Sequence, residues 1–317
     1  MKYSLGIDLG GMSIAFGIVD EEYRLIKKSS VKTPVGKDGY YFADVMAAEI
    51  KKLCSSCDIK PEELKWIGMG VPGHTDSDTG EIIFACNIGM KNFPMAKVLE
   101  EKIGCKVLLG NDANAAALAE AMAGAAKGAK FSVTMTLGTG IGMGIVMDGK
   151  IVTGCHYCAG EVGHMVIVAG GRQCNCGRRG CFETYASATA LIRSTKEAME
   201  ENKDSLLWEI CGGNIENVNG KTAFDAKEKG DITAAKVIDE YMFYLTCGIT
   251  NVINILEPDI ICIGGGISAQ GDKLIKPLNE MVTKEWYSRT EDTTKIVQAA
   301  LGNNAGIIGA ALLGYQD

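Results

Sequence analysis

The sequence predicts an α/β protein with two domains, and three observations support this prediction. The chain has 317 residues, a length that suits two domains of ordinary size. Short apolar runs typical of buried strands are interspersed with stretches that have the apolar spacing of helices. Two of the apolar runs continue through a glycine turn into a second strand, one near the N-terminus and one near the middle of the chain. This recurrence indicates a duplicated half, in which each copy offers one glycine turn.

The first hairpin combines the strand at residues 2–9 with the strand at residues 14–19, joined by Gly10 and Gly11. Backbone N–H groups in such a turn are free to bind phosphate. Asp8 lies at the end of the first strand, where a carboxylate can hold Mg²⁺ through water. A hairpin with no ligand fits the same residues, and the turn alone does not separate the two interpretations.

Further elements are expected between the hairpins and beyond them. They are helices over 40–57, 95–103, 115–126, 186–203, 222–228, 234–256 and 305–313, and strands over 66–71, 105–109 and 260–263. Residues 74–94 look like turns and loops. The last helix is small and apolar, and we expect it to pack back against the N-terminal domain.

The strand at 105–109 leads directly into Gly110, Asn111 and Asp112. Ligands of open α/β sheets bind outside the carboxyl ends of the strands, so Asn111 and Asp112 are expected site residues. The alternative is that Asp112 and Asn114 only cap the following helix, a common role for these residue types.

The second hairpin, residues 132–152, turns at Gly138, Thr139 and Gly140. Its turn adds a hydroxyl group suited to a phosphate oxygen. No helix follows within a βαβ unit, so this is not a dinucleotide-binding fingerprint. A later strand leads into the loop of Gly264, Gly265 and Gly266, where a flat group such as adenine with its ribose can approach the backbone closely.

A cysteine-rich stretch at residues 159–183 predicts a metal site. Cys174, Cys176 and Cys181 follow His164, which gives three thiolates and one imidazole, the ligand set of a closed tetrahedral zinc site. A catalytic zinc would need an open position, so a structural Zn²⁺ is expected. The alternative is a set of buried, reduced cysteines. Glu161 and Glu183 flank the cluster, which indicates a metal that shapes a binding site.

Composition narrows the functional classes. The chain is 47% hydrophobic and 22% charged with a net charge of −7, which argues against a general nucleic-acid or membrane-surface binder. The N-terminus lacks a signal-peptide pattern, and no apolar run has the length of a membrane helix. Twelve cysteines without an export signal indicate a reducing compartment. We therefore expect a cytoplasmic protein.

Taken together, the motifs resemble those of the ROK family of sugar kinases and sugar-responsive repressors, nearly end to end. The matching stretches are 8–11, 110–112, 137–140, 161–164, 174–183 and 264–266. This resemblance implies a two-domain actin/hexokinase-like ATPase fold (ribonuclease H-like) with an interdomain cleft. Residues 1–115 plus 302–317 would form the smaller N-terminal α/β domain, and 116–301 the larger C-terminal α/β domain with the zinc-binding loop 164–183.

The resemblance also implies an ATP-dependent kinase that phosphorylates the 6-hydroxyl of a hexose, with Mg²⁺ as cofactor. Asp112 matches the catalytic base. The sugar-binding positions match Gly73, Asn111, Asp112, Glu161, His164 and Glu183. The ATP and phosphate positions match Asp8, Gly10, Gly11, Ser13, Gly138, Thr139, Gly140, Gly264, Gly265 and Gly266. Members of the family usually form homodimers or homotetramers.

Two departures from the family pattern stand out. Met12 replaces the usual threonine of the first turn, so the phosphate hydroxyl there is lost or comes from Ser13. Cys155 and Cys158 occupy positions where small residues are more common, and packing, an oxidation-sensitive pair and a second metal site are all open for them.

The resemblance leaves more than one function within the family open. Glucose is the expected substrate, with N-acetylmannosamine, fructose and allose as alternatives. A repressor would carry a helix-turn-helix domain before the first turn, which here begins at residue 8. A non-catalytic sugar sensor is disfavoured because Asp112 and both phosphate turns are present.

Overall fold

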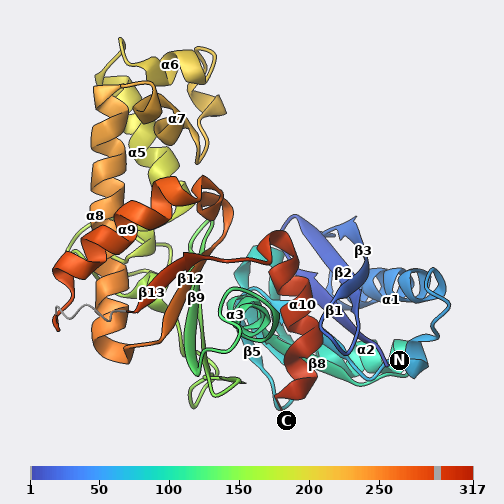
Figure 1. Cartoon of the computed structure of the whole chain (residues 1–317). Helices are drawn as coiled ribbons and strands as arrows, with labels where there is room; N and C mark the ends of the chain where they lie inside the picture. Colours follow the sequence, from blue (N-terminus) through green and yellow to red (C-terminus); the bar gives the residue numbers. More distant parts are fainter. Residues whose placement is uncertain (1, 289–293, 317) are drawn as a thin grey trace. The chain divides into compact units, whose positions relative to one another are not determined.

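The computed structural model describes residues 2–288 and 294–316 (Figure 1). The chain divides into two compact units. The first unit comprises Met1–Thr134, Gly144–Gly160 and Ala300–Asp317, and the second comprises Met135–Met143 and Glu161–Ala299. Residues 116–134 and 144–160 thus pack with the N-terminal part, whereas the sequence-based division assigned them to the C-terminal domain. The boundaries of the functional domains stay a prediction.

The first unit is built on a five-stranded sheet of order β3-β2-β1-β4-β8. Its strands are β1 (Ser4–Leu9), β2 (Ser13–Val19), β3 (Leu25–Lys32), β4 (Ile67–Val71) and β8 (Val107–Asn111). Strands β1, β4 and β8 run parallel, and β2 and β3 are added antiparallel. The predicted N-terminal hairpin is confirmed. Strand β3 was not predicted, because lysines and serines outnumber apolar residues along this edge strand and no apolar residue alternates with them regularly.

Helices pack against this sheet and form two apolar clusters with it. α1 (Gly39–Ser55) and α2 (Met95–Ile103) contribute to one cluster with β1, β2 and β4. α3 (Asp112–Ala123) and α10 (Ala305–Leu312) form a second cluster, and the two helices lie side by side in Figure 1. A side chain at Gly6 or Gly68 would collide with the backbone of α10, so the last helix packs directly on the sheet, as predicted.

A small antiparallel sheet occupies the segment that was expected to be loop. Its strands are β5 (His74–Asp76), β6 (Glu81–Ala85) and β7 (Met90–Phe93), paired in the order β5-β6-β7. The prediction of irregular structure over 74–94 was therefore wrong. These strands are three to five residues long and are separated by turn residues, so they carry too few alternating positions to be recognised from sequence.

A second five-stranded sheet has the order β11-β10-β9-β12-β13. Its strands are β9 (Phe131–Leu137), β10 (Ile141–Met147), β11 (Lys150–Ile151), β12 (Ile260–Gly264) and β13 (Lys295–Gln298). Strands β9 and β10 form the second predicted hairpin, which is confirmed. β12 runs parallel to β13, an edge strand that was not predicted.

The second unit contains most of the remaining helices. They are α4 (Glu183–Ala186), α5 (Ala188–Glu201), α6 (Leu206–Ile210), α7 (Thr222–Glu228), α8 (Ile232–Leu256) and α9 (Asp272–Glu285). The predictions for α5, α7 and α8 are confirmed within a few residues. α9 was missed, and it contains Pro277, a residue that normally argues against a helix interior. In the described part of the chain, no helix combines the length and the apolar character that crossing a membrane requires.

Candidate functional site

The carboxyl ends of the parallel strands bring the predicted residues of the first unit to one sheet edge. Asp8 pairs in register with Gly70, and Gly70 pairs with Gly110. The chain leaves β4 through Gly73 and leaves β8 through Asn111. The side-chain Nδ2 of Asn111 donates a hydrogen bond to the carbonyl oxygen of Gly73, at 3.2 Å. Two residues predicted to bind sugar are thus in direct contact.

Asn111 also caps the helix that carries Asp112. Its Oδ1 accepts hydrogen bonds from the backbone N–H of Ala113 at 2.9 Å and of Asn114 at 3.1 Å. The alternative in which Asp112 and Asn114 are the caps is therefore wrong, because the residue before them takes this role. Asp112 is the first residue of α3, where the partial positive charge of the helix end stabilises its carboxylate. One carboxylate oxygen, Oδ1, accepts a hydrogen bond from the N–H of Ala113 at 2.8 Å.

The first glycine turn is tightly closed. Gly10 N–H donates to the carbonyl oxygen of Ser13 at 3.0 Å, and the hydroxyl of Thr33 donates to the carbonyl oxygen of Gly10 at 2.6 Å. Met12 is 87% exposed, so its side chain lies almost wholly in solvent. Thr33 was not among the predicted residues, because it lies on the chain after β3 and only pairing of the strands brings it here.

Asp8 lies behind this turn, against α10. A side chain at Gly306 would collide with its carboxylate, so the helix approaches as closely as glycine allows. Burial raises the pKa of Asp8, which means that ionising this carboxyl is costly unless a cation is nearby. A hydrated Mg²⁺ fits that requirement. The donor set therefore suits the predicted cofactor.

In the second unit the structure brings together the two other predicted ATP-binding segments. Gly138 N–H donates to the carbonyl oxygen of Gly140 at 3.0 Å and closes the turn between β9 and β10. Gly265 has φ +79°, and a side chain there would collide with the backbone of Leu137. A side chain at Gly140 would in turn collide with the carboxylate of Glu183. The glycine turn therefore lies between the Gly264–Gly266 loop and a predicted sugar-binding acid.

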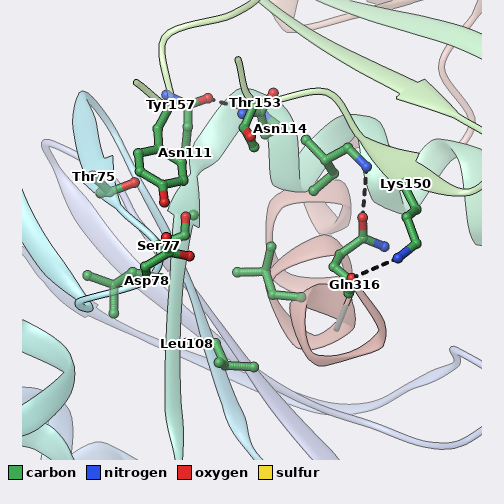
Figure 2. A pocket seen from close by; sticks show the side chains of 14 residues that line it. Thr75, Ser77, Asp78, Leu108, Asn111, Asn114, Lys150, Thr153, Tyr157 and Gln316 are labelled. Atoms are coloured by element: carbon green, nitrogen blue, oxygen red, sulfur yellow. Dashed lines mark hydrogen bonds between the residues drawn. The ribbon is translucent and has the colours of Figure 1, made fainter. Parts of the chain in front are cut away.

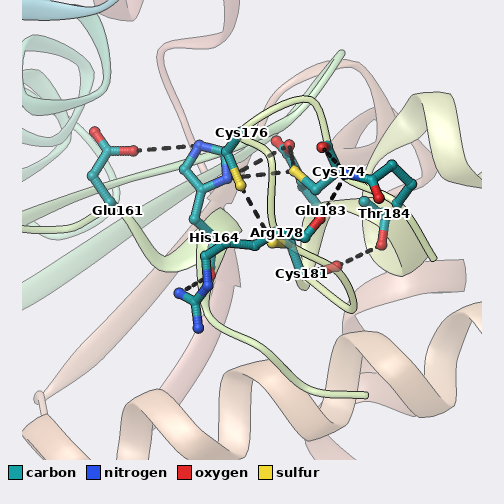
Figure 3. Close-up of polar contacts among 9 residues, drawn as sticks. Glu161, His164, Cys174, Cys176, Arg178, Cys181, Glu183 and Thr184 are labelled. Carbon is teal, nitrogen blue, oxygen red and sulfur yellow. Dashed lines mark hydrogen bonds and ion pairs between the residues drawn. The ribbon is translucent and has the colours of Figure 1, made fainter. Parts of the chain in front are cut away.

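The predicted zinc ligands converge (Figure 3). The ligand atoms of His164, Cys174, Cys176 and Cys181 all lie within 4.8 Å of one another. The sulfur atoms of Cys176 and Cys181 are 3.7 Å apart, and the sulfur of Cys174 is 3.7 Å from Nδ1 of His164. With Zn–S bonds of about 2.3 Å, tetrahedral geometry places two sulfur ligands roughly 3.8 Å apart. The cluster therefore has the dimensions of a zinc site.

His164 faces the cluster with one ring nitrogen and an acid with the other. Nδ1 lies beside Cys174 and 3.7 Å from Oε1 of Glu183, whereas Nε2 points to Glu161 at 3.9 Å. A metal on Nδ1 would leave Nε2 free for a ligand, and second contacts of this kind orient metal-binding histidines. Arg178, which was not predicted, donates from Nη1 to the carbonyl oxygen of His164 at 3.3 Å.

The thiols of the cluster differ in their ease of ionisation. Burial raises the pKa of Cys174 to about 12, and its S–H donates to Oε1 of Glu183 at 3.1 Å. A hydrogen bond from the backbone of Arg178 lowers the pKa of Cys176. Because zinc binds thiolates, a zinc ion at this cluster would have to displace the proton with which Cys174 bonds to Glu183.

Cys155 and Cys158, the second candidate metal pair, are both exposed. Among residues 2–288 and 294–316, no other group of three or more His, Cys, Asp or Glu side chains converges as the zinc cluster does. The possibility of a second metal at this pair is therefore not supported.

The chain is similar over its whole length to known proteins. The model of the ROK family matches residues 4–317. The chain is 37% identical to a glucokinase of Halalkalibacterium halodurans, over 100% of this chain and 96% of that one. It is also 37% identical to a glucokinase of Thermotoga maritima, over 97% and 95%. A crystal structure of a ROK family glucokinase from Streptomyces griseus in complex with glucose and AMPPNP is similar, with a TM-score of 0.84, 31% identity, and coverage of 99% and 100%.

Proposed function

The chain belongs to the ROK family, and from this premise we propose that it transfers the γ-phosphate of ATP to the 6-hydroxyl of glucose. It has the two-domain actin/hexokinase-like fold and is an ATP-dependent hexokinase. The observation that carries the proposal is the position of Asp112. This carboxylate begins α3 at the carboxyl edge of the parallel strands, next to the contact between Asn111 and Gly73.

Asp112 is proposed to take the proton of the sugar 6-hydroxyl as that oxygen attacks the γ-phosphorus. General-base assistance of this kind contributes about 10²- to 10⁴-fold to a rate. The partial positive charge of the helix end interacts favourably with a negative carboxylate, and the hydrogen bond from Ala113 fixes the direction of the side chain. Positioning and charge stabilisation supply most of the remaining acceleration in phosphoryl transfer.

Each of the two glycine turns is proposed to contribute phosphate-binding groups. In the first unit Gly10, Gly11 and Ser13 offer backbone N–H groups and one hydroxyl, and Asp8 would hold a hydrated Mg²⁺. In the second unit Gly138, Thr139 and Gly140 would contact phosphate. The neighbouring loop of Gly264, Gly265 and Gly266 would contact the nucleoside. Mg²⁺ would supply charge neutralisation on the phosphate oxygens.

The remaining sugar contacts are proposed to come from the surroundings of the zinc cluster. Glu161, His164 and Glu183 are linked by contacts of 3.7 and 3.9 Å, so they form one polar group. Zn²⁺ held by His164, Cys174, Cys176 and Cys181 would fix the orientation of the imidazole and thereby of Nε2. The zinc thus serves sugar binding and takes no part in the chemical step.

The proposal is tested by ADP release from Mg-ATP with glucose, N-acetylmannosamine, N-acetylglucosamine, fructose, mannose and allose. We expect glucose to exceed every other sugar in kcat/KM. A higher kcat/KM for N-acetylmannosamine, fructose or allose would support the kinase assignment but identify that sugar, and not glucose, as the substrate. No release with any sugar would favour a non-catalytic sensor. Size-exclusion chromatography with light scattering tests the further proposal of a homodimer or homotetramer.

A further inference from the structure

The proposed function leaves a cavity and a buried threonine of the first unit without a role. The cavity has a volume of about 270 Å³. It is lined by residues from four segments, 75–78, 108–114, 150–157 and 313–316 (Figure 2). Its charged lining residues, Asp78 and Lys150, have opposite signs, so the lining singles out no class of ligand. The threonine is Thr33, and its hydrogen bonds bear on how the first glycine turn binds an anion.

Thr33 is bonded to the first glycine turn at two points. It directly follows β3 and is 3% exposed. Its hydroxyl donates to the carbonyl oxygen of Gly10 at 2.6 Å, and its N–H donates to the carbonyl oxygen of Met12 at 3.1 Å. Pro34 comes next, and a residue that precedes proline is restricted to extended backbone. Thr33 therefore reaches the turn from a stiff segment.

These two bonds determine which way the peptide groups of the turn point. The described peptide bonds are trans, and in a planar trans peptide the C=O and the following N–H point in opposite directions. The carbonyl of Gly10 points to Thr33, so the N–H of Gly11 points away from it. The carbonyl of Met12 also points to this threonine, so the N–H of Ser13 points away as well. The side of the turn opposite Thr33 therefore presents N–H groups.

The N–H groups of Gly11 and Met12 donate to no acceptor in the described part of the chain. Successive N–H groups of this kind bind anions. A peptide between two glycines can flip, because glycine tolerates a wide range of φ and ψ. A flip of the peptide between Gly10 and Gly11 would present a carbonyl oxygen to the anion in place of an N–H. The hydroxyl of Thr33 stabilises the orientation that presents the N–H.

The second glycine turn has the same arrangement with a different donor. The carbonyl oxygen of Gly138, its first glycine, accepts from the N–H of Ala188 at 2.9 Å, and Ala188 is the first residue of α5. In each unit, then, a donor from outside the hairpin binds the carbonyl of the first glycine of the turn. This recurrence in two hairpins that differ in sequence indicates that the orientation serves the ligand of the turn.

We propose that Thr33 is a positioning residue for the nucleotide. By holding the carbonyl of Gly10 on the side away from the phosphates, it directs the N–H of Gly11 toward a phosphate oxygen. Thr33 acts through the turn and does not touch the nucleotide. The inference rests on the proposed function, because it takes the first glycine turn to bind a phosphate of ATP.

Thr33→Val tests the proposal, since valine keeps the shape of the side chain but cannot donate. KM for Mg-ATP is expected to rise about tenfold, while KM for glucose and the melting temperature stay close to those of the unaltered chain. Thr33→Ser retains the hydroxyl and is expected to restore KM for Mg-ATP. Thr283→Val is the matched control, because it removes a hydroxyl that donates to the carbonyl of Asn279 at 2.8 Å, outside the proposed site.

A purely structural role would lower the melting temperature or raise both KM values together. An unchanged KM for Mg-ATP in Thr33→Val, or the same loss in Thr33→Ser, would overturn the proposal.

Amide hydrogen exchange gives a readout that needs no variant. Saturation of the unaltered chain with Mg-AMPPNP is expected to slow exchange in the peptide that covers residues 10–13, because the N–H of Gly11 becomes bonded. Unchanged exchange in this peptide would contradict the proposed direction of the N–H.

Calorimetric binding of Mg-AMPPNP separates this inference from the proposed function, because it does not require turnover. A chain that releases no ADP, but whose Thr33→Val variant binds Mg-AMPPNP about tenfold more weakly, refutes only the kinase assignment. ADP release with glucose, together with an unchanged affinity for Mg-AMPPNP in Thr33→Val, refutes only the role of Thr33.

Discussion

The sulfur of Cys174 lies 3.1 Å from Oε1 of Glu183, so a predicted zinc ligand and a predicted sugar-binding carboxylate share one hydrogen bond. The same oxygen is 3.7 Å from Nδ1 of His164. A metal bound to the Cys174 thiolate would displace this proton to solvent and would thereby change the contacts of Glu183. Zinc occupancy and sugar affinity are expected to change together.

Cys176→Ser tests this coupling. The variant removes one thiolate of four predicted ligands, so we expect zinc content to fall from about one per chain to near zero. Because His164 then loses its fixed orientation, KM for the hexose is expected to rise tenfold or more, in line with the roughly 10- to 100-fold effects of perturbed outer contacts at metal sites. Metal analysis and steady-state kinetics measure both. Cys155→Ser, at an exposed cysteine outside the cluster, is the control and should keep its zinc. Loss of zinc with an unchanged KM would contradict the coupling.

Asp112→Asn separates binding from chemistry. The amide retains an acceptor for the N–H of Ala113 but cannot take a proton, so kcat is expected to fall about 10²- to 10⁴-fold while hexose affinity remains. Single-turnover kinetics and calorimetric binding of the sugar measure the two effects. Asp239→Asn, at an exposed ion pair with Lys227, serves as control. Turnover at the normal rate in Asp112→Asn would rule out the base assignment.

Glu120 is expected to be a main source of stability in the first unit. Its carboxylate is 0% exposed and accepts hydrogen bonds from the N–H groups of Ala125, Ala300 and Leu301 at 2.8 to 3.0 Å. Removing it leaves these donors without their partner, so Glu120→Ala is expected to cost about 2–3 kcal/mol in the free energy of unfolding. Urea denaturation gives the value. Glu101→Ala, at an exposed position of α2, should change it by less than about 0.5 kcal/mol.

Asp231 is expected to make the free energy of unfolding decrease at acidic pH. Burial pushes its pKa up, but hydrogen bonds from the N–H groups of Ala234 and Leu206 and from the hydroxyl of Ser205 outweigh this, so the pKa lies below its ordinary value of 3.8. The unfolded chain then binds the proton more readily, and the stabilisation is complete above pH 3.8 and is lost as pH falls through the folded-state pKa.

The variant Asp231→Asn tests the predicted direction of this pH dependence of stability. It should cost about 1–2 kcal/mol at pH 7, because the amide keeps one acceptor oxygen but its NH₂ group cannot accept the hydrogen bonds from Leu206 and Ser205. The difference from the unaltered chain should shrink below pH 4. Urea denaturation from pH 7 down to pH 3 follows the difference. Asp204→Asn, at an exposed position, is expected to show no such trend. A difference that grows on acidification would mean that the hydrogen bonds do not favour the charged form.

Much of the candidate site was predictable because its residues are neighbours in sequence. The two glycine hairpins needed only strands on either side of a turn, and both are present. The cysteine spacing likewise predicted a cluster, and the four ligand atoms converge within 4.8 Å. The edge strands β3 and β13 were missed because pairing with a neighbour, rather than an apolar pattern, stabilises them.

The sequence by itself determined the glycine turns, the zinc ligand set and Asp112 at the end of a strand, because each depends on a few consecutive residues. Tertiary structure alone decided that Asn111 holds Gly73, that Glu120 reaches the N–H of Ala300, and that Asn114 lines a cavity with Tyr157. These relationships join segments that are far apart in the chain. They exist only where sheet pairing and close helix packing place one backbone against another, and no local pattern encodes such a distance.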